Sequence, residues 1–178
     1  VNALKLAAGG SKILYAASEK RRTKAANPQE LLYGDGAAAF VVASDAGAAE
    51  FLGAKQISVD FVDHYKGDGE DFDYYWEERW IRDEGYLKLV PRALEGLFAE
   101  TGIAASDVDH FILPCVIRRT GGMVAKAAGI PAEAVRDNLH DAMGEAGTAH
   151  ALVMLAQTLE QAKPQEIIVI AGFGQGCD

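Results

Sequence analysis

The sequence has 178 residues, of which 49% are hydrophobic and 24% charged, and these proportions suit one globular domain with a substantial core. Its formal net charge of −9 and the lack of a basic stripe argue against binding to a nucleic-acid backbone. The two cysteines have no zinc or disulfide spacing, and no apolar run reaches the ~20 residues that span a bilayer, so we expect a cytoplasmic protein without a metal site.

The N-terminal region predicts the end of a helix followed by two short strands. Residues 1–8 are helical in pattern and stop at two glycines, which commonly end helices. Residues 12–18 form an apolar run of strand length, and residues 31–44 place two apolar runs around a Gly-Asp-Gly turn. We expect the second of these runs to be a buried strand. The small residues at 36–39 let another backbone or a ligand approach closely.

The middle of the chain predicts a strand, an acidic loop and a long helix. Residues 51–62 alternate in polarity as a strand does, and residues 64–75 are acidic and contain glycines. Over residues 76–101 apolar positions recur every three or four residues, as an amphipathic helix requires, and Pro91 predicts a break or kink in it. The aromatic, acidic stretch 72–86 has two open interpretations: a helix or lid that packs on the body, or a substrate cap or partner surface.

The C-terminal part predicts strands that alternate with helices. Apolar strands that are covered on both faces indicate an α/β protein with a largely parallel sheet. In such a sheet, sites form in the loops beyond the carboxyl ends of the strands. The expected elements are a strand at 108–115, helices at 121–129 and 131–139, a loop at 140–147, a helix at 148–162, and a strand at 166–171 that runs into a glycine loop.

Three segments together resemble the thiolase superfamily, in particular its branch with ketoacyl-ACP synthase III and hydroxymethylglutaryl-CoA synthase. Their order and approximate spacing are those of the family. The first is LYGDGAAAFVV at 32–42, similar to F-G-D-G-A-G-A; the second is YLKLV at 86–90 with VDHFILPC at 108–115, similar to a helix followed by D-W-x-x-P-H; the third is MGEAGTAH at 143–150 with the later KP and GFGQG, similar to G-N-T-S-A-A-S, K-P-G and G-F-G-G-G.

The resemblance implies a thiolase-like α/β fold, which is a duplicated βαβαβαββ architecture. Residues 1–45 would be the end of the first half, and residues 46–178 a truncated second half. It also implies acyl-CoA or acyl carrier protein as the thioester substrate, no resident cofactor, and a homodimer. The nucleophilic cysteine of the family would lie before Val1 and is not in this sequence.

Two of the family's catalytic positions carry other residues here. The family uses a histidine at the end of the P-H strand and an asparagine in the G-N-T loop, and both stabilise developing negative charge. Cys115 follows Pro114 at the histidine position, and Glu145 follows Gly144 at the asparagine position. An ionised Glu145 would repel an oxyanion, whereas a protonated one could donate a hydrogen bond and a carboxylate could act as a general base. Altered chemistry and loss of catalysis both remain open.

Further candidates follow from the residues around these positions. Cys115 is either a buried packing residue or a second thiol beside the acyl site. His140 and His150 could each replace the missing histidine, or be structural. The basic cluster at 20–24 is either a solvated loop or a contact for a phosphorylated ligand.

The resemblance also assigns substrate-binding residues. Arg118 and Arg119 would lie at the mouth of a pantetheine tunnel, where they would meet CoA phosphates or an acidic carrier protein. The loop that contains Gly172, Phe173 and Gly174 would offer its backbone N–H groups to an oxyanion, or would only form a tight turn. Two functions are therefore predicted: an acyltransferase that needs a nucleophile-bearing N-terminal half, or a non-catalytic thiolase-like module that acts in dimerisation or shapes a partner's site.

Overall fold

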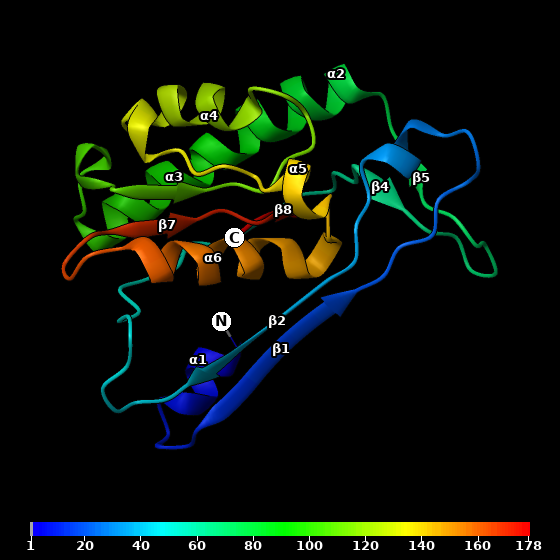
Figure 1. Ribbon diagram of the computed structural model, residues 1–178. Coiled ribbons are helices and arrows are strands. Elements are labelled where there is room, and N and C mark those ends of the chain that lie inside the picture. The colour runs from blue at the N-terminus through cyan, green and yellow to red at the C-terminus, as the bar shows by residue number, and fades with distance from the viewer. Residues whose placement is uncertain (1) are drawn as a thin grey trace.

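The computed structural model describes residues 2–178, and its centre is a short parallel strand pair between two layers of helices. In Figure 1, α3 and α4 lie above this pair and α6 lies below it. Predicted helices at 121–129 and 148–162 are confirmed, with slightly different ends. The elements are β6 (His110–Ile112), β7 (Ile168–Ile170), α3 (Leu87–Thr101), α4 (Thr120–Ala128) and α6 (His150–Gln161).

The strands β6 and β7 carry the core. They pair in parallel from His110 opposite Ile168 to Ile112 opposite Ile170. Phe111 and Ile112 are fully buried, because helices cover both faces of the pair. Burial of such apolar side chains is the main favourable term in folding.

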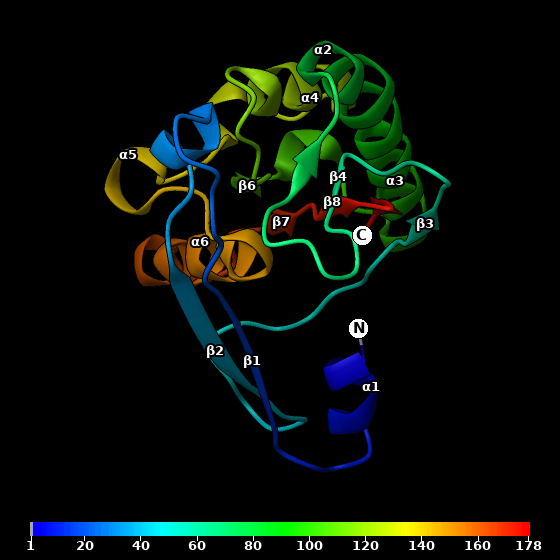
Figure 2. The ribbon, with the colours of Figure 1, turned by 90° about the vertical axis from the view of Figure 1, so that its right-hand side faces the viewer.

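A long antiparallel hairpin projects from this body, as Figure 2 shows. Its strands β1 (Ile13–Glu19) and β2 (Gly36–Val42) pair from Ile13 opposite Val42 to Glu19 opposite Gly36, and helix α1 (Asn2–Ala7) packs near its far end. Half-buried and exposed residues alternate along β2, and neither strand has a buried residue, so the expectation of a buried second strand is wrong. The Val41 side chain, for example, is 68% exposed, because only one face of the hairpin meets the body.

Two predicted elements are shorter than expected. The strand predicted at 51–62 is only β3 (Ile57–Ser58), because Phe61 N–H donates to the carbonyl of Val59 in a tight turn directly after it. The helix predicted at 131–139 is a single 3-10 turn, Ala132–Ala134. Beyond that turn the chain is extended and Arg136 N–H donates to the carbonyl of Phe111, so pairing with the edge of β6 overrides local helix propensity.

The predicted helix at 76–101 is confirmed as a helical segment but contains a change of winding. It begins as α2 (Glu78–Trp80), widens into a π-turn at Ile81–Tyr86, and continues as α3 straight through Pro91. The distortion therefore precedes the proline, and Pro91 is accommodated within an intact helix. The loop predicted at 140–147 contains the short helix α5 (His140–Met143).

The remaining strand pairs are short and antiparallel. Between residues 2 and 178, the only ladder of parallel strands is β6–β7, so the prediction of a largely parallel sheet is wrong. In three of the four antiparallel pairs a hairpin brings neighbouring strands together without a crossover helix, whereas β3 pairs with the C-terminal strand far away in the sequence. These pairs join β4 (His64–Tyr65) to β5 (Tyr74–Tyr75), and β9 (Gly176–Cys177) to both β3 and β8 (Phe173–Gly174).

Candidate functional site

Two glycine segments that are far apart in the sequence cross at close range and position Glu145. A Cβ atom on Gly34 would collide with the Met143 carbonyl oxygen, and one on Gly144 would lie 2.8 Å from the Gly34 nitrogen. Gly144 also has a φ of 71°, which favours glycine. Glu145 N–H donates to the Leu32 carbonyl at 2.6 Å, and Gly34 N–H donates back to the Glu145 carbonyl at 3.0 Å. This crossing fixes Glu145, and it lies at Gly34, just before the small residues 36–39 where a close approach was expected; Gly36 itself meets the Ala146 side chain.

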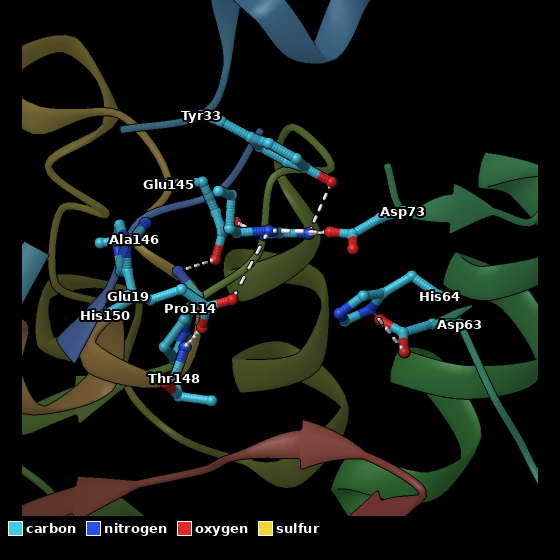
Figure 3. Close-up of polar contacts among 12 residues, drawn as sticks. Glu19, Tyr33, Asp63, His64, Asp73, Pro114, Glu145, Ala146, Thr148 and His150 are labelled. Atoms are coloured by element: carbon cyan, nitrogen blue, oxygen red, sulfur yellow. Dashed lines mark hydrogen bonds and ion pairs between the residues drawn. The ribbon is translucent and has the colours of Figure 1, made fainter. Parts of the chain in front are cut away.

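A buried arginine lies at the centre of the polar groups in this region. The Arg21 side chain is 7% exposed and forms ion pairs with Glu145 and, at 2.7 Å, with Asp73. It also donates to the Tyr33 hydroxyl at 2.6 Å, and its guanidinium lies 3.6 Å from the centre of the Tyr33 ring. Figure 3 shows Tyr33, Glu145 and Asp73 converging on this point from separate segments.

The two carboxylates of this cluster stabilise the charged form of Arg21. Burial opposes the charged form of Arg21, but Glu145 and Asp73 outweigh it, so the pKa of Arg21 is raised. Burial raises the pKa of the Tyr33 hydroxyl to about 12, although the arginine pulls it down. Arg21 is therefore a permanent cation and Tyr33 a neutral phenol at physiological pH.

Both carboxylate oxygens of Glu145 have partners within the protein. Oε1 accepts from Gly147 N–H at 2.7 Å, while Oε2 accepts from Arg21. Its side chain is 14% exposed. Since one oxygen accepts a backbone N–H and the other pairs with a buried cation, neither oxygen is free to donate to a substrate or to act on it as a general base.

Glu19 supports the same turn from the neighbouring strand. Its Oε2 accepts from Thr148 N–H at 2.7 Å. Glu19 and Glu145 thus satisfy two N–H groups at the turn Gly147–Ala149, which leads into α6. Negative groups are favourable at the start of a helix, so both carboxylates act here as helix caps.

His150 is fully buried, and both of its ring nitrogens are engaged. Nδ1 accepts from Ala146 N–H at 3.0 Å, which leaves Nε2 protonated to donate to the Asn138 carbonyl at 2.6 Å. The tautomer is assigned from these partners. The centre of the His140 ring lies 5.0 Å from that of His150. The pKa of His140 is lowered, mainly by burial and to a lesser extent by the neighbouring His150. His150 has no ring nitrogen left for a substrate.

Cys115 is part of the hydrophobic core. It is 4% exposed, and its Sγ donates to the Ile117 carbonyl at 3.7 Å. Burial raises the pKa of the Cys115 thiol. A neutral, enclosed thiol is a poor nucleophile, so this geometry supports packing more than acyl transfer.

Within residues 2–178, no hydrogen bond or ion pair joins the predicted substrate-binding residues Arg118, Arg119 and Phe173 to Glu145. Arg118 and Arg119 are exposed, and within residues 2–178 neither side chain takes part in an ion pair. Gly172 N–H donates to the Asp178 carbonyl at 2.6 Å, so this N–H is not free for an oxyanion. The Phe173 ring packs 4.1 Å from the Tyr86 ring, centre to centre.

Sequence reasoning missed the residues that surround Glu145. Arg21 lies in the basic cluster at 20–24, where a solvated loop or a phosphorylated ligand was expected, yet it is buried while Lys20 and Arg22 point outward. Nothing in the sequence distinguishes Arg21 from its exposed neighbours. Asp73 lies in a loop whose acidic residues look alike in sequence, so only the structure identifies it as the partner.

Comparison with known proteins identifies relatives of the C-terminal part most clearly. Residues 98–178 match the family described as 3-oxoacyl-[acyl-carrier-protein] synthase III C terminal. A hydroxymethylglutaryl-CoA synthase of Caldivirga maquilingensis is 31% identical over 148 residues, which are 83% of this chain and 42% of that protein. A beta-ketoacyl-[acyl-carrier-protein] synthase III of Lactobacillus delbrueckii subsp. bulgaricus is 26% identical over 160 residues, which are 82% of this chain and 50% of that protein.

Solved structures share the arrangement of elements. The 3-oxoacyl-(acyl carrier protein) synthase III of Pseudomonas aeruginosa PAO1 superposes with a TM-score of 0.80 at 21% identity, over 97% of this chain and 58% of that one. A hydroxymethylglutaryl-CoA synthase in complex with CoA superposes with a TM-score of 0.68 at 15% identity, over 94% and 47% of the two chains. The chain thus spans about half the length of the proteins it resembles.

Proposed function

Residues 98–178 belong to the C-terminal domain family of 3-oxoacyl-[acyl-carrier-protein] synthase III, and from this premise we propose that the protein acts on acyl thioesters of coenzyme A or an acyl carrier protein. The reaction that we propose is transfer of the acyl group from one thiol to another. The nucleophile would be a cysteine outside this chain, because Cys115 and Cys177 are both buried. The names of the relatives support this class of substrate.

Acyl transfer requires fewer hydrogen-bond donors from this chain than condensation does. A thiolate attacks the thioester carbonyl, the carbonyl oxygen takes the negative charge, and the intermediate collapses to release the first thiolate. Attack by a second thiolate reverses these steps and releases the acyl group to the new carrier. Condensation also creates a carbanion or enolate, which needs hydrogen-bond donors close by. Glu145 can only accept, and a carboxylate there opposes new negative charge.

The observation that carries this proposal is the Arg21–Glu145 ion pair. It occupies the position where the family resemblance expects an asparagine that donates hydrogen bonds to the reacting group. Since Gly147 N–H and Arg21 satisfy both Glu145 oxygens, the pair serves the fold and leaves that position without a donor. We therefore expect exchange of acyl groups without formation of a carbon–carbon bond.

The test uses the complete protein with radiolabelled acyl-CoA. In one reaction the acceptor is an acyl carrier protein or unlabelled CoA, and in another it is the malonyl thioester. We expect label to move to the acceptor thiol and no β-ketoacyl product to form. A β-ketoacyl product would overturn the assignment of acyl exchange, and transfer to neither acceptor would favour the second candidate function.

The second candidate is a non-catalytic thiolase-like module that shapes a partner's site. It is favoured by one observation: Cys115, Glu145 and His150 all direct their polar atoms to groups of this same chain. Under this candidate, acyl-CoA added to the complete protein would leave no acyl group on any cysteine, as mass spectrometry of its peptides would show. An acylated cysteine would exclude it.

We further propose that the complete protein is a homodimer, as the family resemblance implies. The projecting hairpin supports this because Leu14 and Val41 are largely exposed on it. Light scattering after gel filtration would give the mass of two chains. The mass of one chain at micromolar concentration would contradict a stable dimer.

A further inference from the structure

A row of exposed aromatic rings lies at the end of the molecule formed by β4, β5 and α2. Its members are Tyr65, Tyr74, Trp76 and Trp80, which we call the aromatic row. Successive ring centres are 5.2, 5.6 and 5.9 Å apart, and each side chain is between 40% and 52% exposed. Figure 1 shows β4 and β5 together at one end of the molecule. Four contiguous aromatic side chains are unusual on a solvent-facing surface.

The core holds the aromatic row in place. Trp80 stacks on the buried Phe61 with ring centres 4.3 Å apart, and Phe61 contacts Phe173, which packs on Tyr86. Asp73, in the loop just before β5, is tied to Arg21. The aromatic row is thus supported at both ends. Since its side chains are already held in place, binding costs little further conformational entropy.

Carboxylates without internal partners flank the aromatic row. Asp68 and Glu70 lie in the loop between β4 and β5, and Glu78 lies between Trp76 and Trp80. All three are exposed, and within residues 2–178 none of them forms an ion pair. Two exposed cations, Lys66 and Arg79, also lie in these segments, but carboxylates outnumber them, so the surface is apolar along its centre and mainly negative at its margins.

We propose that the aromatic row and its three flanking carboxylates form a docking surface for an arginine- or lysine-rich segment of a protein partner. Guanidinium and ammonium groups are attracted to the faces of Trp and Tyr, and their charges complement Asp68, Glu70 and Glu78. An acidic carrier protein or an anionic lipid surface would be repelled here. The aromatic row adjoins the Arg21–Glu145 cluster through Asp73, but this inference does not depend on the proposed acyl transfer.

The two tryptophans of the chain both belong to the aromatic row, so intrinsic fluorescence reports on this surface. The complete protein is titrated with an eight-residue peptide of alternating arginine and leucine, and with a matched peptide of alternating glutamate and leucine. If the complete protein has further tryptophans, the same titrations of Trp76→Phe and Trp80→Phe assign the signal. We expect a saturable change with the arginine peptide that weakens as salt is raised, and none with the glutamate peptide.

Charge-matched variants separate this surface from general attraction between an acidic protein and a cationic peptide. In one variant Asp68→Asn, Glu70→Gln and Glu78→Gln are combined, and in the other Glu95→Gln, Glu133→Gln and Glu160→Gln. The first should weaken binding roughly tenfold, since each exposed pair contributes a small increment, and the second should leave it within about twofold. Tyr74→Ala, which removes an exposed ring but no charge, should weaken binding as well.

Three results would overturn the proposal. They are equal weakening by both triple variants, equal binding of the two peptides, and no saturable signal with the arginine peptide. A fluorescence change that depends on protein concentration alone would assign the face to a second copy of the chain instead. Circular dichroism of each variant confirms that its fold is intact before binding is compared.

Discussion

Arg21 holds together three segments that are distant in the sequence. Its guanidinium contacts Glu145 from the loop before α6, Asp73 from the loop before β5, and the Tyr33 ring. Two carboxylates around one buried cation compensate its charge, and each would be costly if the cation were removed. At the scale of single residues, we therefore attribute to Arg21 the positioning of Glu145.

Replacement of Arg21 by methionine tests this role. Glu145 and Asp73 would be left buried without their cation, so we expect the free energy of unfolding to fall by about 3 kcal/mol. Arg22→Met is the matched control, because Arg22 pairs with Asp71 on the surface and should change stability by less than about 0.5 kcal/mol. Urea unfolding measures both. If both variants lowered the free energy of unfolding by the same small amount, the buried ion pairs of Arg21 would contribute no more to stability than the surface pair of Arg22.

The thiols give a second prediction at this scale. Burial raises the pKa of Cys115, and it raises the pKa of Cys177 to about 12, so very little thiolate is present at pH 8. We expect a thiol reagent such as iodoacetamide to label neither residue in the folded protein within minutes, and both in urea. Peptide mapping identifies the labelled residue. Rapid labelling of Cys115 in the folded protein would restore it as a candidate nucleophile.

Among the helices, α3 depends on the residue that caps its C-terminal end. Gly102, which follows Thr101, has a φ of 73° and no neighbouring atom where a Cβ would lie. Gly102→Ala should therefore destabilise the protein by about 1 kcal/mol through backbone strain alone.

Gly122 in α4 is the matched control for this helix end. It is equally open but has ordinary helical geometry, so Gly122→Ala should stabilise by up to ~1 kcal/mol. Thermal unfolding of the two variants compares them directly. The same sign for both substitutions would contradict the account of the α3 end.

The β4–β5 hairpin should respond to pH through His64. The hydrogen bond to Asp63 raises the pKa of His64, and burial opposes this shift. A histidine whose pKa is raised in the folded state stabilises it fully below the unfolded pKa of about 6.5, and this stabilisation is lost as pH rises through the folded pKa. The difference in unfolding free energy between the wild type and Asp63→Asn should therefore be larger at pH 5.5 than at pH 8.5. A difference that does not change with pH would show that the His64 charge is not coupled to folding.

Sequence patterns predicted the elements whose stability is local. The helices α4 and α6 were predicted at 121–129 and 148–162, and the strands β6 and β7 lie within the apolar runs predicted as strands at 108–115 and 166–171. The segment at 131–139 was predicted as a helix, because its extended shape depends on pairing with β6, which no local pattern contains. Similarly, the strand at 51–62 shortened to two residues because only Ile57 and Ser58 meet β9.

At the scale of the whole molecule, the thiolase-like α/β fold predicted from three motifs is confirmed by its structural neighbours. The crossing of Gly34 and Gly144 was not predicted, because no local pattern links two segments so far apart in the sequence. The partners of Glu145 could not be predicted. Arg21 lies in a basic cluster and Asp73 in an acidic loop, and nothing in the sequence shows which residue of each group is buried. No helix within residues 2–178 combines the length and apolarity that a bilayer-spanning segment needs.

The central claim is that Glu145 serves the fold through Arg21 and takes no part in chemistry. The measurement that tests it most directly is the rate of acyl exchange between CoA and a second thiol, catalysed by the complete protein and by its Glu145→Gln variant. Glutamine still reaches Gly147 N–H, and Arg21 keeps Asp73, so the variant should fold. We predict rates within about twofold of each other. A loss of about a hundredfold or more in a folded variant, the size expected when a group that stabilises a transition state is removed, would contradict the account.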